Sequence, residues 1–97
     1  MNPPPTELDG ARVSLWSPID SRHKKTAVIR LYADGQEQLD FAGIAIAAYK
    51  KEGSGAYVFY CDSSWEVLND CAYADVEEAK KEAELQFEGL NSTWLEL

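Results

Sequence analysis

Four residues between positions 17 and 23 are of the types that hydrolytic enzymes use. Ser17, Ser21, Asp20 and His23 could supply a nucleophile, a base and a carboxylate that orients the base. That chemistry also needs a rigid scaffold and donors to an oxyanion, and one short polar loop offers neither. The chain has no G-x-S-x-G turn either. We therefore interpret this segment as a solvated loop, and we expect no catalytic residue and no enzyme activity.

The oxygen-rich turn at Asp62-Ser63-Ser64 could suggest a calcium site. An EF-hand loop that began at Asp62 would need Gly at its sixth position and Glu at its twelfth. The chain has Val67 and Tyr73 there. Asp and Ser are also common turn formers, and no glycine-rich phosphate motif occurs anywhere in the sequence. We expect a simple turn, no metal and no bound cofactor.

Two cysteines, Cys61 and Cys71, are the only thiols in the chain. With the single His23 they are too few for a zinc site. In the strand register that the turns suggest, they lie at opposite ends of one hairpin. That separation is about 20 Å at ~3.3 Å per residue, and a disulfide needs Cα atoms within ~7 Å. We expect two reduced thiols.

The net charge of the chain lies entirely in its last third. Residues 1–61 hold equal numbers of acidic and basic residues, whereas residues 62–97 hold ten acids and two lysines, which matches the total of −8. Such a field repels nucleic acid and acidic lipid and attracts basic protein surfaces. The basic run Arg22-His23-Lys24-Lys25 is too short to predict nucleic-acid binding, and it could pair with acids of its own chain or of a neighbour. We expect no direct nucleic-acid or membrane contact.

Residues 75–90 have the pattern of a capped amphipathic helix. Asp75 is a good N-cap, and Glu78 stands three residues on, as in a capping box. The apolar stripe predicted to be buried is Val76, Ala79, Ala83, Phe87 and Leu90. Gly89 or Asn91 could end the helix. The opposite side carries the candidate partner-binding acids Glu77, Glu84 and Glu88.

The rest of the chain predicts an antiparallel sheet. Alternating or β-branched runs indicate strands over about 11–16, 26–33, 38–50, 56–61 and 65–73. Residues 1–10 are Pro-rich and are expected to form a flexible arm before a single domain of residues 11–97. The fold class is α+β, with four to five strands and one C-terminal helix on one face. The start has no signal peptide and the longest apolar run is too short to span a bilayer, so we expect a cytoplasmic protein.

Asp34-Gly35 predicts a hairpin turn. A two-residue turn would pair Ala33 with Gln36 and mix apolar and polar residues on one face. A bulge at Gly35 would instead place Ile29 and Leu31 on one face with Leu39 and Phe41. We therefore expect the bulged turn.

Both faces of the central strands are apolar. The odd-numbered face carries the small residues Gly43, Ala45 and Ala47, which we expect to pack against Ala79 and Ala83 of the helix. The even-numbered face would then need another cover. That cover could be the N-terminal strand and C-terminal tail, a second copy of the chain, or a different partner. The candidate interface on this even face is Ile44, Ile46, Val58, Tyr60 and Leu68.

Residues 55–65 and 75–84 together resemble parts of known bacterial proteins. The stretch from Gly55 to Trp65, followed by Asp75-Val-Glu-Glu-Ala-Lys-Lys-Glu-Ala-Glu84, resembles small bacterial proteins of unassigned function. The order of a strand hairpin and then a D-x-E-E-A helix is similar to HicB-type antitoxins, over about residues 39–90. Cys61-Asp62-Ser63-Ser64-Trp65 stands where those antitoxins have a Pro-Asp-Leu-Pro-Gly turn. The resemblance implies an acidic, partner-binding role and no catalytic residue.

Two functions therefore remain as expectations. The first is a small acidic, non-enzymatic protein-binding module of antitoxin, immunity-like or regulatory type, with a basic protein as its partner. The alternative is a homodimeric small-ligand-binding or regulatory domain, which would use the even face or a pocket under Trp65.

Overall fold

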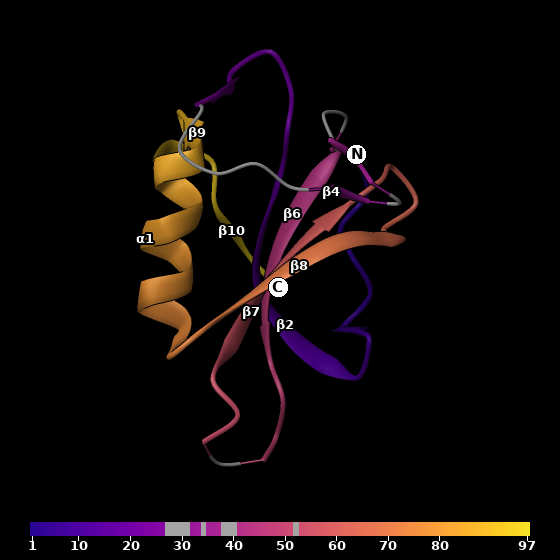
Figure 1. The fold of residues 1–97 in the computed structure, drawn as a ribbon, viewed down its shortest axis with the longest axis vertical. Helices are drawn as coiled ribbons and strands as arrows, with labels where there is room; N and C mark the ends of the chain where they lie inside the picture. The colour runs from indigo at the N-terminus through magenta and orange to yellow at the C-terminus, as the bar shows by residue number, and fades with distance from the viewer. Residues whose placement is uncertain (27–31, 34, 38–40, 52) are drawn as a thin grey trace.

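One helix packs on a curled antiparallel sheet, as the sequence predicts (Figure 1). The computed structural model describes residues 1–26, 32–33, 35–37, 41–51 and 53–97. The elements in these residues are β1 (Glu7–Leu8), β2 (Ala11–Pro18), β3 (Lys24–Lys25), β4 (Tyr32–Ala33), β5 (Gln36–Glu37), β6 (Gly43–Ala48), β7 (Ala56–Cys61), β8 (Val67–Tyr73), α1 (Val76–Gln86), β9 (Phe87–Glu88), a 3-10 turn (Leu90–Ser92) and β10 (Leu95–Glu96). The α+β class with a C-terminal helix is confirmed.

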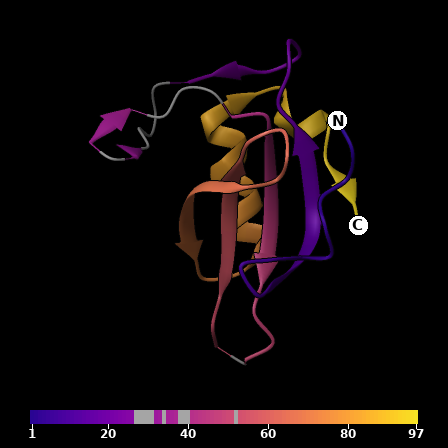
Figure 2. The same ribbon diagram turned by 90° about the vertical axis from the view of Figure 1, so that its right-hand side faces the viewer.

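The main sheet has the order β1-β2-β6-β7-β8, and β10 also pairs with β2. β6 and β7 pair without interruption, with Ile44 opposite Tyr60 and Ile46 opposite Val58. β2 pairs with β6 through a register shift between Val13 and Leu15. Figure 2 views the sheet from the side opposite α1, so the helix lies behind it and the C-terminal segment runs beside β2. The tail therefore forms part of the fold.

The helix begins where the sequence predicts and ends earlier. The Asp75 side chain accepts a hydrogen bond from the Glu78 backbone N–H (2.8 Å), which is the expected N-cap. The helix stops at Gln86 because Phe87 is already extended, with φ −135° and ψ 111°. Phe87 and Glu88 then form β9, which pairs with β3. The prediction that Gly89 or Asn91 ends the helix is wrong.

The helix covers the even face of the sheet, which corrects the predicted packing. Ala79 and Ala83 lie in one buried cluster with Ile44, Val58 and Tyr60. All of these side chains are fully buried. The remaining even-face residues, Ile46 and Leu68, belong to the same cluster. The expected contact of the helix with Ala45 and Ala47 is therefore wrong.

The odd face is closed by the chain itself. Ala45 and Ala47 lie in a second buried cluster with Trp16 and Trp65. The two indole rings meet edge to face, with centroids 5.7 Å apart. Leu8, Val13, Phe59 and Cys61 complete this cluster. The alternative in which the N-terminal strand covers the even face is wrong, because α1 covers that face and β2 is itself a strand of the sheet.

Residues 1–10, expected to be a flexible arm, pack against the domain. Glu7–Leu8 pairs with β2, and the Leu8 side chain is buried. Pro4 is also buried, and the Trp65 indole N–H donates to the Asn2 carbonyl (2.9 Å). This segment therefore contributes to the packed structure.

The pairing of β4 with β5 has the register of a two-residue turn and not the bulged register that we expected. Ala33 pairs with Gln36 and Tyr32 with Glu37, which is the two-residue turn. The face predicted for Ile29, Leu31 and Leu39 lies outside the described residues.

No helix in the described part of the chain is long and apolar enough to cross a membrane.

Candidate functional sites

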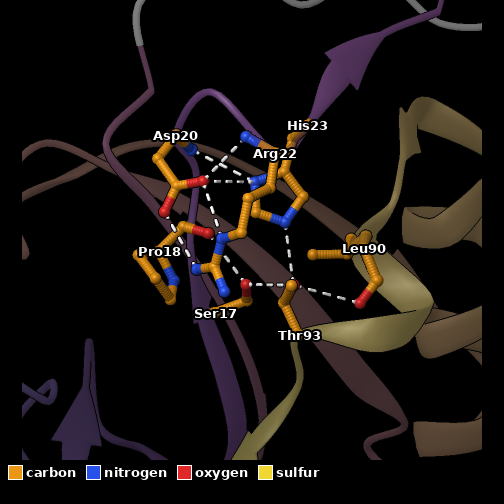
Figure 3. Close-up of polar contacts among 7 residues, drawn as sticks. All are labelled: Ser17, Pro18, Asp20, Arg22, His23, Leu90 and Thr93. Atoms are coloured by element: carbon orange, nitrogen blue, oxygen red, sulfur yellow. Dashed lines mark hydrogen bonds and ion pairs between the residues drawn. The ribbon is translucent and has the colours of Figure 1, made fainter.

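His23 is the centre of a buried polar network rather than part of a solvated loop (Figure 3). Its side chain has no exposed surface. The Asp20 backbone N–H donates to Nδ1 (3.1 Å), and Nε2 lies 2.8 Å from the Thr93 hydroxyl. An Nδ1 that accepts a hydrogen bond carries no proton, so the imidazole is neutral and Nε2–H donates to Thr93. Thr93 Oγ1 in turn lies 2.8 Å from Ser17 Oγ.

This arrangement excludes Ser17 as a hydrolytic nucleophile. Its side chain is fully buried, and its hydroxyl donates to the Pro18 carbonyl (2.8 Å). The Asp20 carboxylate pairs with Arg22 (2.9 Å), whose side-chain hydrogen bond lowers the pKa of Asp20 to about 2. The network joins the loop after β2 to the C-terminal tail. Thr93 lies far away in sequence, and no motif could have identified it.

Neither cysteine is an activated nucleophile, and both are free thiols, as expected. Burial is the main reason that the pKa of Cys61 rises to about 12, and the neighbouring Asp62 adds to the effect. Burial also raises the pKa of Cys71. A thiol attacks as its thiolate, so a raised pKa suppresses that chemistry.

Buried tyrosines flank Cys71 under the helix. The Tyr60 hydroxyl donates to the Gln86 side-chain carbonyl, and burial raises the pKa of Tyr60. The Gln86 amide is within 3.5 Å of the Tyr73 hydroxyl. These contacts hold the helix to the sheet through neutral groups, and none of them supplies a charged acid or base.

Asp62 acts as a turn former, as the sequence predicts. Its Oδ1 accepts hydrogen bonds from the backbone N–H groups of Ser64 (2.8 Å) and Glu66 (2.9 Å). Among the described residues, no group of three or more His, Cys, Asp and Glu side chains could hold a metal ion.

The three candidate partner-binding acids lie in different settings. Glu77 is exposed in the first turn of α1. Glu84 accepts a hydrogen bond from the Trp94 indole (2.9 Å), which fixes the tail to the helix. Glu88 is exposed in β9, where its Cα partner is Lys24. Lys24 thus lies opposite one acid of the chain in the strand pairing, and no ion pair joins the two side chains among the described residues.

Most of the negative charge on the described residues is not neutralised by ion pairs among them. Across the described ranges, the only ion pair between charged side chains joins Asp20 to Arg22, and the neutral His23 ring lies 3.5 Å from the Asp20 carboxylate. None of the ten acids of residues 62–97 is in an ion pair there. The exposed members of that set are Glu66, Asp70, Asp75, Glu77, Glu78, Glu88 and Glu96.

The two interface sites that the alternative function needs are filled. Ile44, Ile46, Val58 and Tyr60 have no exposed surface, because α1 lies over them, so the even face cannot bind a second copy. Leu68 packs at the edge of the same cluster. The Trp65 ring lies against Gly43: a Cβ built on Gly43 would be 2.7 Å from the indole. The indole therefore leaves no room for a ligand between its ring and Gly43.

A groove that the sequence did not predict lies beside the start of the helix. Its volume is about 650 Å³, and its floor includes Leu15, Ala48 and Val76. Arg12 and Lys50 also line it. No sequence signal pointed to it, because it depends on which strands the helix leaves uncovered.

Comparison of the chain with protein-family models, with curated proteins and with solved structures gives no match. The class of protein is therefore defined by its fold and surface alone: a small acidic α+β domain with one helix on a curled antiparallel sheet.

Proposed function

We propose that this chain is a small acidic, non-enzymatic protein-binding module of antitoxin, immunity-like or regulatory type. Its partner presents a basic surface to the acids at both ends of α1. The observation that carries the proposal is the lack of ion pairs for the acids of residues 62–97 within the described residues. Unpaired exposed acids raise the self-repulsion of the folded chain. A basic partner surface would neutralise that charge.

The nature of the polar groups supports a binding role over an enzymatic one. His23 is buried and neutral, and Ser17 has no exposed surface. The thiols have raised pKa values. Such groups stabilise the fold, whereas the exposed charge of the chain is available to a partner.

The contact acids that we propose are Glu77 and Glu88, because both are exposed and neither side chain forms an ion pair among the described residues. Glu84 also belongs to this acidic flank, and its bond to Trp94 makes it a poorer test site. We define the acidic flank as Glu77, Glu84 and Glu88. Electrostatic association of this kind is steered by the field and weakened by salt.

The test is capture of partners from an extract of the source cells by the wild type and two charge variants. Glu77→Lys with Glu88→Lys reverses the flank. Glu66→Lys with Asp70→Lys makes the same change in net charge elsewhere, on the turn before β8 and on β8. The proposal expects a partner that high salt releases, that the flank variant loses and that the matched control retains. A partner retained equally by both variants contradicts the proposal.

The groove favours a second candidate function, a small-ligand-binding domain. Its volume of about 650 Å³ lies within the range of ligand sites in proteins, roughly 300–1,000 Å³. This candidate uses none of the buried even-face residues Ile44, Ile46, Val58 and Tyr60, and it needs no second copy of the chain.

A further inference from the structure

The groove exists because one helix cannot cover the whole sheet. A helix is ~10 Å wide and strands are ~4.8 Å apart, so one helix covers about two strands. α1 packs on β6, β7 and β8. Trp94 of the tail joins the same cluster as Leu15 and Ile19. The start of β2 is left open on the helix side.

The floor of the groove is apolar and its walls come from three elements. Leu15 and Ala48 are both half-buried and line the groove on the sheet side. Val76, the first residue of α1, lines one wall. Leu97, at the far end of the tail, forms another and is 46% exposed. The groove can therefore hold an apolar group that stays exposed to water on one side.

Two cations stand at the rim, one on β2 and one just after β6. Arg12 is the Cα partner of Ala48, two residues from the buried Ile46, so its side chain starts on the helix side of the sheet. Lys50 follows shortly after β6. Both side chains are exposed and line the groove. Within the part of the chain that the structure describes, neither forms an ion pair. Glu96 of β10 also lines the groove and is the Cα partner of Leu15, whereas Glu7 of β1 is the Cα partner of Arg12.

We propose that this groove binds a free single-chain amphipathic carboxylate. The carboxylate lies between Arg12 and Lys50, away from Glu96, and the apolar chain covers Leu15, Ala48 and Val76. The inference deepens the second candidate function by naming its ligand class. It is independent of the acidic flank, since it uses none of Glu77, Glu84 and Glu88.

The charge pattern decides between ligands of equal apolarity. Arg12 and Lys50, which form no ion pair among the described residues, favour an anionic head, and Glu96 penalises an anion placed beside β10. An alcohol of the same chain length would gain the apolar contacts without the ion pairs, and a quaternary ammonium would meet Arg12 and Lys50 as like charges. Affinity should follow the order carboxylate, alcohol, ammonium.

The experiment titrates the whole chain at neutral pH with decanoate, decanol and decyltrimethylammonium, each below its micelle concentration. Calorimetry gives the affinity and amide NMR shifts give the location. We expect decanoate to bind tightest, with shifts centred on Leu15, Ala48 and Val76. Arg12→Gln and Lys50→Gln should each weaken decanoate binding about twofold to fivefold, as expected for exposed ion pairs, and leave decanol unchanged. Lys51→Gln is the matched control and should change neither.

Ala48→Phe fills the groove and should abolish decanoate binding, while the far-UV spectrum and the capture of the basic partner stay as in the wild type. Equal affinity for the three probes, or shifts located elsewhere, overturns the proposal. So does an Ala48→Phe chain that binds decanoate normally. The proposal is also overturned if no probe binds the wild type and Ala48→Phe changes the oligomeric state. That result would assign the groove to a second copy of the chain. Failure to capture a basic partner leaves this inference intact.

Discussion

The imidazole Nε2 of His23 lies 2.8 Å from the hydroxyl oxygen of Thr93, and this contact joins the loop after β2 to the C-terminal turn. Both groups are withdrawn from water, since the His23 side chain has no exposed surface. Gly89 lies close by, and its position brings the tail against the Arg22 carbonyl. The tail therefore depends on a polar contact as well as on apolar packing.

Thr93→Val should destabilise the protein by about 1–3 kcal/mol, because the buried Nε2–H of His23 loses its acceptor. Thr93→Ser keeps the hydroxyl and is the matched control. Urea unfolding of both variants measures the difference. Equal urea midpoints for Thr93→Val and Thr93→Ser would contradict a stabilising role for the hydrogen bond between His23 and Thr93.

Ala83→Leu should cost about 1–3 kcal/mol, because Ala83 is fully buried against the even face and has no room for a larger side chain. Lys81→Leu introduces the same residue at an exposed position of the helix and should change the stability by less than about 0.5 kcal/mol. Thermal unfolding compares the two. A melting temperature unchanged by Ala83→Leu would contradict the packing of α1 described here.

Gly89→Ala should destabilise more than Gly53→Ala. Both glycines have positive φ (89° and 80°), so both variants carry the conformational cost of ~1–2 kcal/mol. A Cβ on Gly89 would lie 2.5 Å from the Arg22 carbonyl oxygen, whereas one on Gly53 meets nothing within 4 Å. The excess cost at Gly89 reports the close approach of the tail. Unfolding in denaturant measures both variants. An equal loss of unfolding free energy in the two would contradict the close contact between Gly89 and the Arg22 carbonyl.

The free energy of unfolding should fall as the pH rises from 9 to 12. Burial raises the pKa of Cys61 from 9.0 to about 12, so the folded chain holds this proton after the unfolded chain has lost it. The stabilisation is complete below pH 9 and is lost as the pH approaches 12, at ~1.4 kcal/mol per pH unit for one proton. Cys61→Ala should reduce this slope by about one proton, measured by unfolding at several alkaline pH values. An unchanged slope would show that the thiol does not take part.

Cys61 and Cys71 should both react slowly with an alkylating reagent in the folded protein. Both cysteines carry raised pKa values, and Cys61 has no exposed surface while Cys71 is half-buried. Iodoacetamide at neutral pH should therefore label Cys71 slowly and Cys61 only after unfolding. Mass spectrometry after timed labelling identifies the site. Rapid labelling of Cys61 in the native protein would contradict its burial.

The order of the main strands and the helix could be predicted from the sequence, because local residue patterns indicate each of these elements. Ala56–Cys61 forms a strand within the predicted boundaries, and Asp75 caps the helix as expected. The end of the helix was wrong because the pairing of Phe87 with Lys25 outweighed the local pattern. A strand pairing between residues so far apart in the sequence cannot be predicted from the local pattern of either segment.

The choice of sheet face failed for a physical reason. Alternation indicates the buried face only where the other face is polar, and here both faces are buried. We expected small residues of the helix to meet small residues of the sheet. Instead the small Ala79 and Ala83 pack with large Ile44 and Tyr60, and the small Ala45 packs with large tryptophans on the other side. Each interface thus combines small and large side chains and fills its volume.

The site residues were the least predictable part. The groove depends on the width of one helix against several strands, and the His23 network depends on Thr93 at the other end of the chain. The sequence did indicate the acidic flank, through net charge. The structure adds that one of its three members is bound to Trp94.

The most direct test of the protein-binding function is the dissociation constant of the captured partner, measured against salt concentration for the wild type and for Glu77→Lys with Glu88→Lys. We predict that the variant binds about tenfold or more weakly at low salt, and that its affinity depends less steeply on salt than that of the wild type. Glu66→Lys with Asp70→Lys should stay close to the wild type in both respects. Equal affinities and equal salt dependence for the wild type and the flank variant would contradict the proposed function.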